Sequence, residues 1–260
     1  MTQESHPNFI SRGIDYLNAL GAKLRDLTGY RSLLNELIQN ADDARATTIS
    51  FDCSQDALVV DNDGTFSDCG QAEAPECLWK DKQGHLCDFH RFRLVASGDK
   101  RSEFGTTGAF GIGFISVYQV TNTPHLISGE RHWEVIETNP EDQRIRICTA
   151  GCSLCKAPSL PRTRFIFPWA RDAQAEMRRR LSVPPVASDD ITELLAQIRE
   201  ALPTAMVFLK NVTVVEVRQD GQLVQRCERR REGDRMLVAH DGDKTPQSWW
   251  LLAGDFASAA

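Results

Sequence analysis

A row of polar side chains lies on a predicted helix near the start of the chain. In the stretch ELIQNADDARAT, Glu36, Asn40 and Asp43 are spaced at i, i+4 and i+7, which places them on one helix face. The amide oxygen of Asn40 is a hard ligand that Mg²⁺ accepts, and Glu36 could orient and deprotonate a water aimed at a γ-phosphate. A solvated helix face is the alternative. Asp42 lies about 100° off the row and is expected to face solvent.

A carboxylate ends the second of two predicted strands. In VVDNDG, at residues 59–64, Asp61 stands where the strand turns. Held there by the strand, its carboxylate could accept a hydrogen bond from an exocyclic amine such as adenine N6. The alternative is a plain Asn-Asp-Gly turn, since these residue types favour turns without any ligand.

Glycines crowd the stretch GTTGAFGIGF, at residues 105–114. They let the backbone approach a phosphate closely, and a helix starting near Ile112 would point its N–H groups at that phosphate. The stretch is not a Walker loop, because no Gly-Lys-Ser/Thr follows. It is not a dinucleotide fingerprint either, because the spacing is G-x-x-G-x-G and no βαβ unit surrounds it. The glycines are Gly105, Gly108, Gly111 and Gly113.

Three cysteines fall close together in the stretch CTAGCSLC. Cys148, Cys152 and Cys155 include a Cys-x-x-Cys pair, a spacing typical of zinc knuckles. No second Cys-x-x-Cys pair supports the site, so free thiols are the alternative. Eight cysteines without a signal pattern favour thiols or a metal site over a disulfide framework. The fourth zinc ligand would come from Cys77, His85, Cys87 or His90.

The totals are those of an ordinary globular protein. The chain has 260 residues, of which 41% are hydrophobic and 25% charged, enough to bury a core. A net charge of −6 gives no sign of a general nucleic-acid binder, although a local basic site stays open. The stretch from Arg226 to Arg235 mixes basic and acidic residues, which favours a solvated hairpin. No membrane-spanning run and no signal pattern occur, so the cytoplasm is the expected compartment.

The order of predicted elements favours an α+β fold. Helices are expected at residues 8–27, 30–45, 91–96, 171–181 and 189–201, and a loop leads into a helix at 108–120. Strands are expected at 48–53, 57–60, 125–128, 132–137, 144–148, 162–167, 207–218, 222–229 and 249–252. We expect a two-layer sandwich, in which a mixed, mostly antiparallel sheet carries helices on one face. Residues 1–170 would form the core and residues 171–260 an extension packed on it.

Taken in order, these motifs resemble the GHKL ATPase superfamily, which includes heat-shock-ninety chaperones, type II topoisomerases and histidine kinases. The resemblance is strongest to the sacsin and heat-shock-ninety branch. NELIQNADDA resembles the first motif of that branch, and GAFGIGFISVYQV resembles its glycine motif. ASGDK resembles the start of its ATP lid, and RTRFIFP a late strand with a threonine near adenine. The sacsin-like pattern continues in MVFLKNVTVVEV and covers most of the chain.

The resemblance implies a Bergerat-type fold that binds ATP and Mg²⁺ under a mobile lid. It implies that Glu36 is the general base, that Asn40 binds Mg²⁺ and that Asp61 reads adenine. This sequence departs from the family at Asp63, which replaces a glycine of the Asp-x-Gly-x-Gly turn, and at Arg162, which replaces the glycine before the late threonine. The other implied nucleotide-binding residues are Asp43, Ser97, Gly98, Lys100, Gly108, Ala109, Phe110, Gly111, Ile112, Gly113, Phe114 and Thr163.

The resemblance therefore implies an ATP-hydrolysing, chaperone-like switch with a lid at residues 97–107. The alternative is a regulatory module that binds ATP or ADP without hydrolysing it. A histidine kinase is disfavoured, because no helical pair with a phosphoacceptor histidine precedes the domain. Relatives draw a γ-phosphate cation from a later domain, so we expect an N-terminal module of a longer protein with slow hydrolysis on its own. Its expected partners are further domains, other proteins, or a second copy in an ATP-dependent homodimer.

Overall fold

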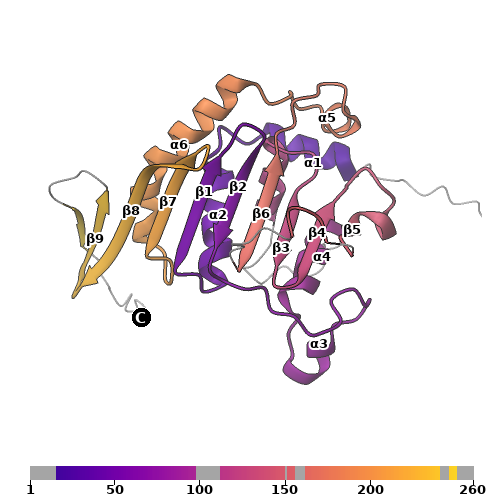
Figure 1. The fold of residues 1–260 in the computed structure, drawn as a ribbon, viewed down its shortest axis with the longest axis horizontal. Helices are drawn as coiled ribbons and strands as arrows, with labels where there is room; N and C mark the ends of the chain where they lie inside the picture. Colours follow the sequence, from indigo (N-terminus) through magenta and orange to yellow (C-terminus); the bar gives the residue numbers. More distant parts are fainter. Residues whose placement is uncertain (1–15, 98–111, 150, 156–161, 241–245, 251–260) are drawn as a thin grey trace, which may run out of the picture.

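A mixed sheet of ten strands is the central element of the described residues (Figure 1). The computed structural model describes residues 16–97, 112–149, 151–155, 162–240 and 246–250. Within them, the strand order is β10-β9-β8-β7-β1-β2-β6-β3-β4-β5. Neighbouring strands are antiparallel except β1 and β7, which run parallel. The expected α+β fold with a mixed, mostly antiparallel sheet is confirmed.

The strands are β1 Thr48–Cys53, β2 Ala57–Asn62, β3 His125–Ser128, β4 Arg131–Val135, β5 Ile145–Ile147, β6 Thr163–Pro168, β7 Val214–Gln219, β8 Gln222–Glu232, β9 Arg235–His240 and β10 Gln247–Trp250. The α-helices are α1 Tyr16–Arg25, α2 Arg31–Asp43, α3 Leu78–Gln83, α4 Asp88–Ser97, α5 Glu176–Leu181 and α6 Ser188–Val207. Two 3-10 helices are η1 Ile112–Gln119 and η2 Glu141–Gln143. Among the described helices, none is long and apolar enough to cross a membrane.

The main helices cover one face of the sheet, as expected. In Figure 1, α1 and α2 lie behind the central strands, and α6 packs along β7, β8 and β9. The apolar stripe of α2, which includes Leu37 and Ala41, shares one core with sheet residues such as Phe51. The opposite face holds a much smaller cluster around Ile127 and Ile166. Any ligand held against α2 must therefore meet the helix-covered face.

Residues after 170 extend this sheet, because β7 lies beside β1. The parallel pairing runs from Thr48 opposite Val214 to Cys53 opposite Gln219. The tight turn into β8 uses Asp220 and Gly221, both with positive φ, as expected for a two-residue hairpin. The division of the chain at residue 170 stays a prediction.

Helix α6 is longer than the sequence pattern predicts. It continues past Pro203 to Val207, so the strand expected from residue 207 begins only at Val214. The reason is a continuous buried stripe, which outweighs the cost of the proline. Its members are Leu194, Ile198, Leu202 and Met206.

The basic stretch forms the expected hairpin, and its second strand, β9, is absent from the predicted elements. Gly233, with a φ of 59°, makes the turn between β8 and β9. Basic and acidic side chains pair along β8, as Arg230 does with Glu232 at 3.0 Å. These pairs offset part of the positive charge of the hairpin.

Asp42 joins the end of α2 to the chain that enters β7. It is only 5% exposed, so the expectation that Asp42 faces solvent is wrong. Its carboxylate accepts backbone N–H groups from Lys210 at 2.9 Å, Asn211 at 2.6 Å and Val212 at 2.8 Å. The segment after α6 covers this side of α2, a contact between residues far apart in the chain. The carboxylate supplies acceptors for three N–H groups that precede the strand.

Replacing this carboxylate should destabilise the fold. In Asp42→Ala, the three N–H groups lose a charged acceptor, which we expect to lower the free energy of unfolding by about 3 kcal/mol. Urea unfolding followed by circular dichroism measures this value. The matched control is Asp43→Ala, on the same helix but exposed, which should change it by less than about 0.5 kcal/mol. Equal effects of the two substitutions would contradict the role given to Asp42.

Candidate functional site

The polar row on α2 is present, and its members differ in burial. Asn40 is buried, Glu36 is half-buried and Asp43 is exposed at the end of the helix. Burial raises the pKa of Glu36 above its usual value, and the negative charge of Asp43 adds to that rise. Glu36 is therefore a stronger base than a fully solvated carboxylate.

The glycine-rich stretch is described only from η1 onward. η1 begins with Ile112 and Gly113 and packs against α2. The ring of Phe114 lies in the core, with its centroid 5.2 Å from that of Phe92 and 5.8 Å from that of Phe165. Ser97 is the last residue of α4. The other predicted nucleotide-binding residues of this region lie outside the described residues, namely Gly98, Lys100, Gly108, Ala109, Phe110 and Gly111.

The side chain of Asp61, on strand β2, points to the face of the sheet that lies away from α2. Successive side chains of a strand point to opposite faces, and Leu58 and Val60 belong to the core beneath the helices. Asp61 therefore shares the other face with Arg164, its partner on β6. The guanidinium donates to both carboxylate oxygens at 2.7 Å. On that face Asp61 also lines a hollow of about 470 Å³. The structure thus does not bring Asp61 together with the polar row.

The residue that β2 presents to the helix layer at this point is Asn62. It is buried and lies opposite Thr163 in the sheet. The Thr163 hydroxyl donates to the carbonyl oxygen of Gly64 at 2.7 Å and lies 2.8 Å from the hydroxyl of Ser128. Asn62 Oδ1 accepts the N–H of Gly64 at 3.0 Å. We call these four residues the buried polar cluster.

Gly64 places the buried polar cluster against the end of α2. A Cβ at this position would lie 3.0 Å from the carbonyl oxygen of Ala44 and 3.0 Å from Asn62 Oδ1. A side chain there would push the turn away from the helix, so the close approach requires glycine. Ala44 follows directly after Asp43. The end of α2 that carries Asp43 therefore lies beside the buried polar cluster.

The two departures from the family pattern anchor the same turn. Asp63 accepts the N–H groups of Thr47 at 2.7 Å and Thr48 at 3.0 Å, and also the Thr47 hydroxyl. Burial alone would raise the pKa of Asp63, but these hydrogen bonds hold it below its usual value. The carbonyl oxygen of Arg162 accepts the Ser128 hydroxyl at 3.1 Å. Both departures are thus compatible with an ordered turn after β2.

The predicted zinc ligands Cys148, Cys152 and Cys155 do come together. The fourth member is His132 of β4, whose Nδ1 lies 3.1 Å from Cys155 Sγ and 3.5 Å from Cys152 Sγ. All four ligand atoms lie within 4.8 Å of one another. The fourth ligand expected from residues 77–90 is therefore wrong. We call this group the β4–β5 cysteine cluster.

The residues expected to supply that fourth ligand lie elsewhere. Cys77, Cys87 and His90 form a second group with Cys69. His85 is exposed, and its Nδ1 lies 3.3 Å from the carbonyl oxygen of Leu86. This second group is the α3–α4 cysteine cluster.

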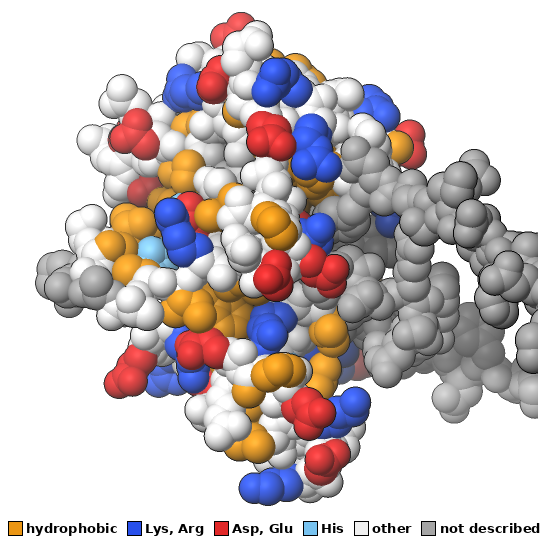
Figure 2. All heavy atoms as spheres, turned by 90° about the vertical axis from the view of Figure 1, so that its right-hand side faces the viewer, with side chains coloured by type: hydrophobic (Ala, Val, Ile, Leu, Met, Phe, Trp, Pro, Cys, Tyr) orange, Lys and Arg blue, Asp and Glu red, His pale blue; other side chains and the backbone are white. Residues whose placement is uncertain are grey.

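A cavity of about 930 Å³ opens between the α3–α4 region and the β4–β5 edge. Its lining includes Cys77, His90, Arg93 and Trp133. Figure 2 shows this side of the molecule, where charges of both signs are interspersed with hydrophobic side chains. No lining residue comes from α2 or from the end of β2, so this cavity is separate from the polar row.

Asn62 and His132 are absent from the predicted site residues. The two-residue period of β2 carried a usable signal, since Leu58, Val60 and Asn62 share a face. No local spacing points to His132, because pairing of β4 with β5 brings it to the cysteines. The backbone N–H of Cys148 donates to the carbonyl oxygen of His132 at 3.0 Å.

The one-sided α+β sheet, with an acidic and amide row on the helix beside it, fits the class of GHKL-type, heat-shock-ninety-like domains that the sequence resembles. Residues 17–145, just under half of the chain, match the family described as the Sacsin domain. Human sacsin is 36% identical over 101 residues, which is 38% of this chain but only 2% of that protein. The chain is therefore similar to the Sacsin domain family over this stretch. The match includes α2 and the turn after β2, whereas Thr163 lies beyond it.

Proposed function

We propose that this chain is an ATP-binding and ATP-hydrolysing module that acts as a lid-gated conformational switch. The observation that carries the proposal is the closeness of the end of α2, the helix with the polar row, to the buried polar cluster, and most of both falls in the stretch that matches the Sacsin domain. One end of this arrangement offers a half-buried base, and the other offers neutral hydrogen-bonding groups. An ATP site needs both kinds of group, because the phosphates react beside the catalytic carboxylate and the adenine ring must be recognised by hydrogen bonds.

Glu36 is the proposed general base. Its raised pKa favours accepting a proton from a water that attacks the γ-phosphate. Half-burial keeps the carboxylate accessible while still removing part of its hydration. The negative charge of Asp43 also raises the pKa of Glu36, and so increases its affinity for the proton.

Asn40 is the proposed Mg²⁺ ligand. It supplies one neutral oxygen from a buried position on the same face of α2 as Glu36. This fits a metal that keeps several waters and takes its remaining ligands from phosphates. When bound, the metal would neutralise phosphate charge, and the protein's own part is to position that ion beside the base.

Thr163 and Asn62 are proposed to face the adenine end. Both are buried, polar and directed to the helix-covered face, where they are already ordered by Gly64. Asp61 lies on the other face, and both of its carboxylate oxygens are engaged by Arg164. We therefore assign the recognition of adenine to the Asn62–Thr163 pair, and keep the role implied for Asp61 as the competing hypothesis.

Closure of residues 97–107 over ATP is the proposed switch. A ligand shifts such an equilibrium only through contacts that it makes better in one state, and γ-phosphate contacts would supply them. The stabilising cation for that phosphate is expected from a further domain or a partner protein. The alternative function is a nucleotide-binding module that does not hydrolyse ATP. Glu36 distinguishes the two functions, because a module that only senses the nucleotide needs no general base at this position.

Glu36→Ala should abolish ATP hydrolysis and leave ATP affinity within about twofold, because only the base is removed. Single-turnover hydrolysis measures the first quantity and a binding titration with Mg²⁺ the second. Asn35→Ala, an exposed neighbour on α2, is the matched control and should retain hydrolysis. Unchanged turnover in Glu36→Ala would overturn the assignment and favour the sensor function if ATP still binds.

Thr163→Val should weaken ATP binding about tenfold, because the isosteric change removes one hydroxyl from the proposed adenine end. Asp61→Asn should leave affinity near the wild-type value, since it changes a side chain on the opposite face. Titrations of both variants with ATP, after circular dichroism confirms folding, compare the two hypotheses. Loss of binding in Asp61→Asn alone would restore the adenine role to Asp61.

We also propose that the β4–β5 cysteine cluster holds a structural zinc ion. Three sulfurs and one imidazole match the ligand set of closed zinc sites. His125 Nδ1 lies 3.1 Å from His132 Nε2, which leaves His132 Nδ1 for the sulfur side of the cluster. This contact orients the His132 imidazole. Zinc-binding histidines are usually oriented in this way by a partner on their second nitrogen, whereas a cluster of free thiols does not require it.

Cys152→Ser should lower the zinc content of the purified chain by one equivalent, because a closed site loses affinity with one thiolate gone. Inductively coupled plasma mass spectrometry measures the metal. Cys53→Ala is the control, because Cys53 is buried in β1 outside both cysteine clusters. Identical zinc content in Cys152→Ser and wild type would exclude zinc at this cluster.

A further inference from the structure

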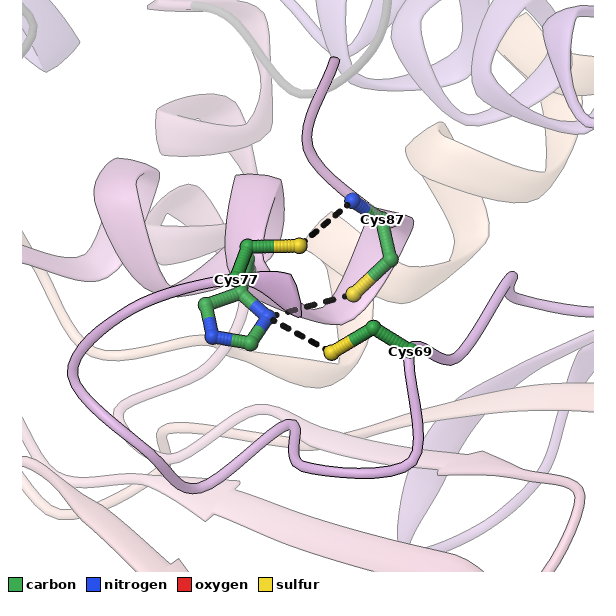
Figure 3. Close-up of side chains that lie close together, drawn as sticks. Cys69, Cys77 and Cys87 are labelled. Carbon is green, nitrogen blue, oxygen red and sulfur yellow. Dashed lines mark hydrogen bonds between the residues drawn. The ribbon is translucent and has the colours of Figure 1, made fainter. Parts of the chain in front are cut away.

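The α3–α4 cysteine cluster consists of Cys69, Cys77, Cys87 and His90. Their four ligand atoms lie within 4.8 Å of one another. His90 Nδ1 is 3.1 Å from Cys87 Sγ and 3.7 Å from Cys69 Sγ. Figure 3 shows the three cysteine side chains reaching one small region from separate parts of the chain. Tetrahedral zinc with three sulfurs and one nitrogen separates its ligand atoms by about 3.5–3.8 Å, close to these distances.

The local fold prepares this arrangement. Cys87 directly precedes α4 and His90 lies in its first turn, so the two face the same side three residues apart. Cys77 directly precedes α3, and Cys69 lies in the loop after β2. The ligands therefore come from a loop and two helix starts, which the fold brings together.

A second layer of hydrogen bonds orients the ligands. His90 Nε2 lies 3.1 Å from the carbonyl oxygen of Ala74, which can only accept, so Nε2 carries the proton and Nδ1 is left for a metal. The same carbonyl oxygen accepts from Arg93 at 2.5 Å. The backbone N–H of Cys87 donates to Cys77 Sγ at 3.3 Å, as it would to a metal-bound thiolate.

Helix α3 contributes no buried side chain to the core, although the segment on either side of it does, through residues such as Ala72 and Phe89. No residue of α3 is buried, and Leu78 is 41% exposed. At its base the segment is closed by Ser67 and Asp88, where the Asp88 carboxylate accepts the Ser67 N–H at 2.8 Å and hydroxyl at 2.7 Å. A short helix without buried side chains of its own gains order from a cross-link at its start, and a bound metal is one such cross-link.

We propose that Cys69, Cys77, Cys87 and His90 bind a structural zinc ion that fixes α3 and the start of α4. Four protein ligands fill the tetrahedral coordination and leave no open position, so this ion has no catalytic role. The zinc orders the beginning of the helix that ends at Ser97, where the predicted lid starts. The site is independent of the proposed ATPase activity, because none of its ligands belongs to the polar row or the buried polar cluster.

The test is the zinc content of the full chain, expressed with zinc and measured by plasma mass spectrometry. Cys87→Ser should contain one zinc equivalent less than wild type, and Cys53→Ala should match wild type. Cys152→Ser removes the zinc of the β4–β5 cysteine cluster. The double variant Cys87→Ser/Cys152→Ser should therefore contain two zinc equivalents less than wild type, because the losses at two separate sites add. Cobalt substitution of Cys152→Ser should still give the intense visible and near-ultraviolet bands of tetrahedral thiolate coordination.

Wild-type zinc content in Cys87→Ser, or a metal-free wild type with Cys77 and Cys87 joined as a disulfide in mass spectrometry, would overturn the proposal. If Cys87→Ser does not fold, Cys69→Ser takes its place, since Cys69 is only partly buried. A metal-binding wild type should also show faster proteolysis within residues 68–93 after chelation. Unchanged proteolysis there would overturn the stabilising role.

Discussion

The pairing of β2 with β6 is the constraint on which the candidate site depends. Because side chains alternate along a strand, this register directs Asn62 and Thr163 toward α2, and Asp61 with Arg164 to the other face. A slip of β2 by one residue would turn Asp61 toward α2 and Asn62 away from it, and would move Leu58 and Val60 out of the core. Burial of those apolar side chains therefore selects which polar groups the helix layer meets.

The position of α2 depends in turn on residues far along the chain. Asp42 accepts three N–H groups from residues 210–212, and Ala44 is in contact with the turn at Gly64. One helix end is thus hydrogen-bonded to the entry of β7 and lies close to the turn after β2. The strands after residue 170 contribute to the position of Glu36 and Asn40, although no predicted site residue beyond Thr163 lies among them.

The two cysteine clusters lie on opposite faces of the sheet near the same edge. His132 and Trp133 are neighbours on β4 and point to different sides, and Trp133 lines the cavity beside the α3–α4 cluster. Each cluster combines ligands that are near in sequence with at least one that is distant. The prediction that Cys148, Cys152 and Cys155 lie together is confirmed, whereas the prediction of a fourth ligand from residues 77–90 is wrong.

By itself the sequence determined the local features. The stripe and polar row of α2, the bounds of β1 and the turn at Asp220–Gly221 follow from periods of 3.6 and 2 and from turn chemistry, which act between near neighbours. Only the tertiary structure decided that Asp42 is buried, that Asp61 faces away from α2, and that His132 joins the cysteines. Each of these depends on which distant segment packs opposite the residue, and that choice is made by burial of the whole core.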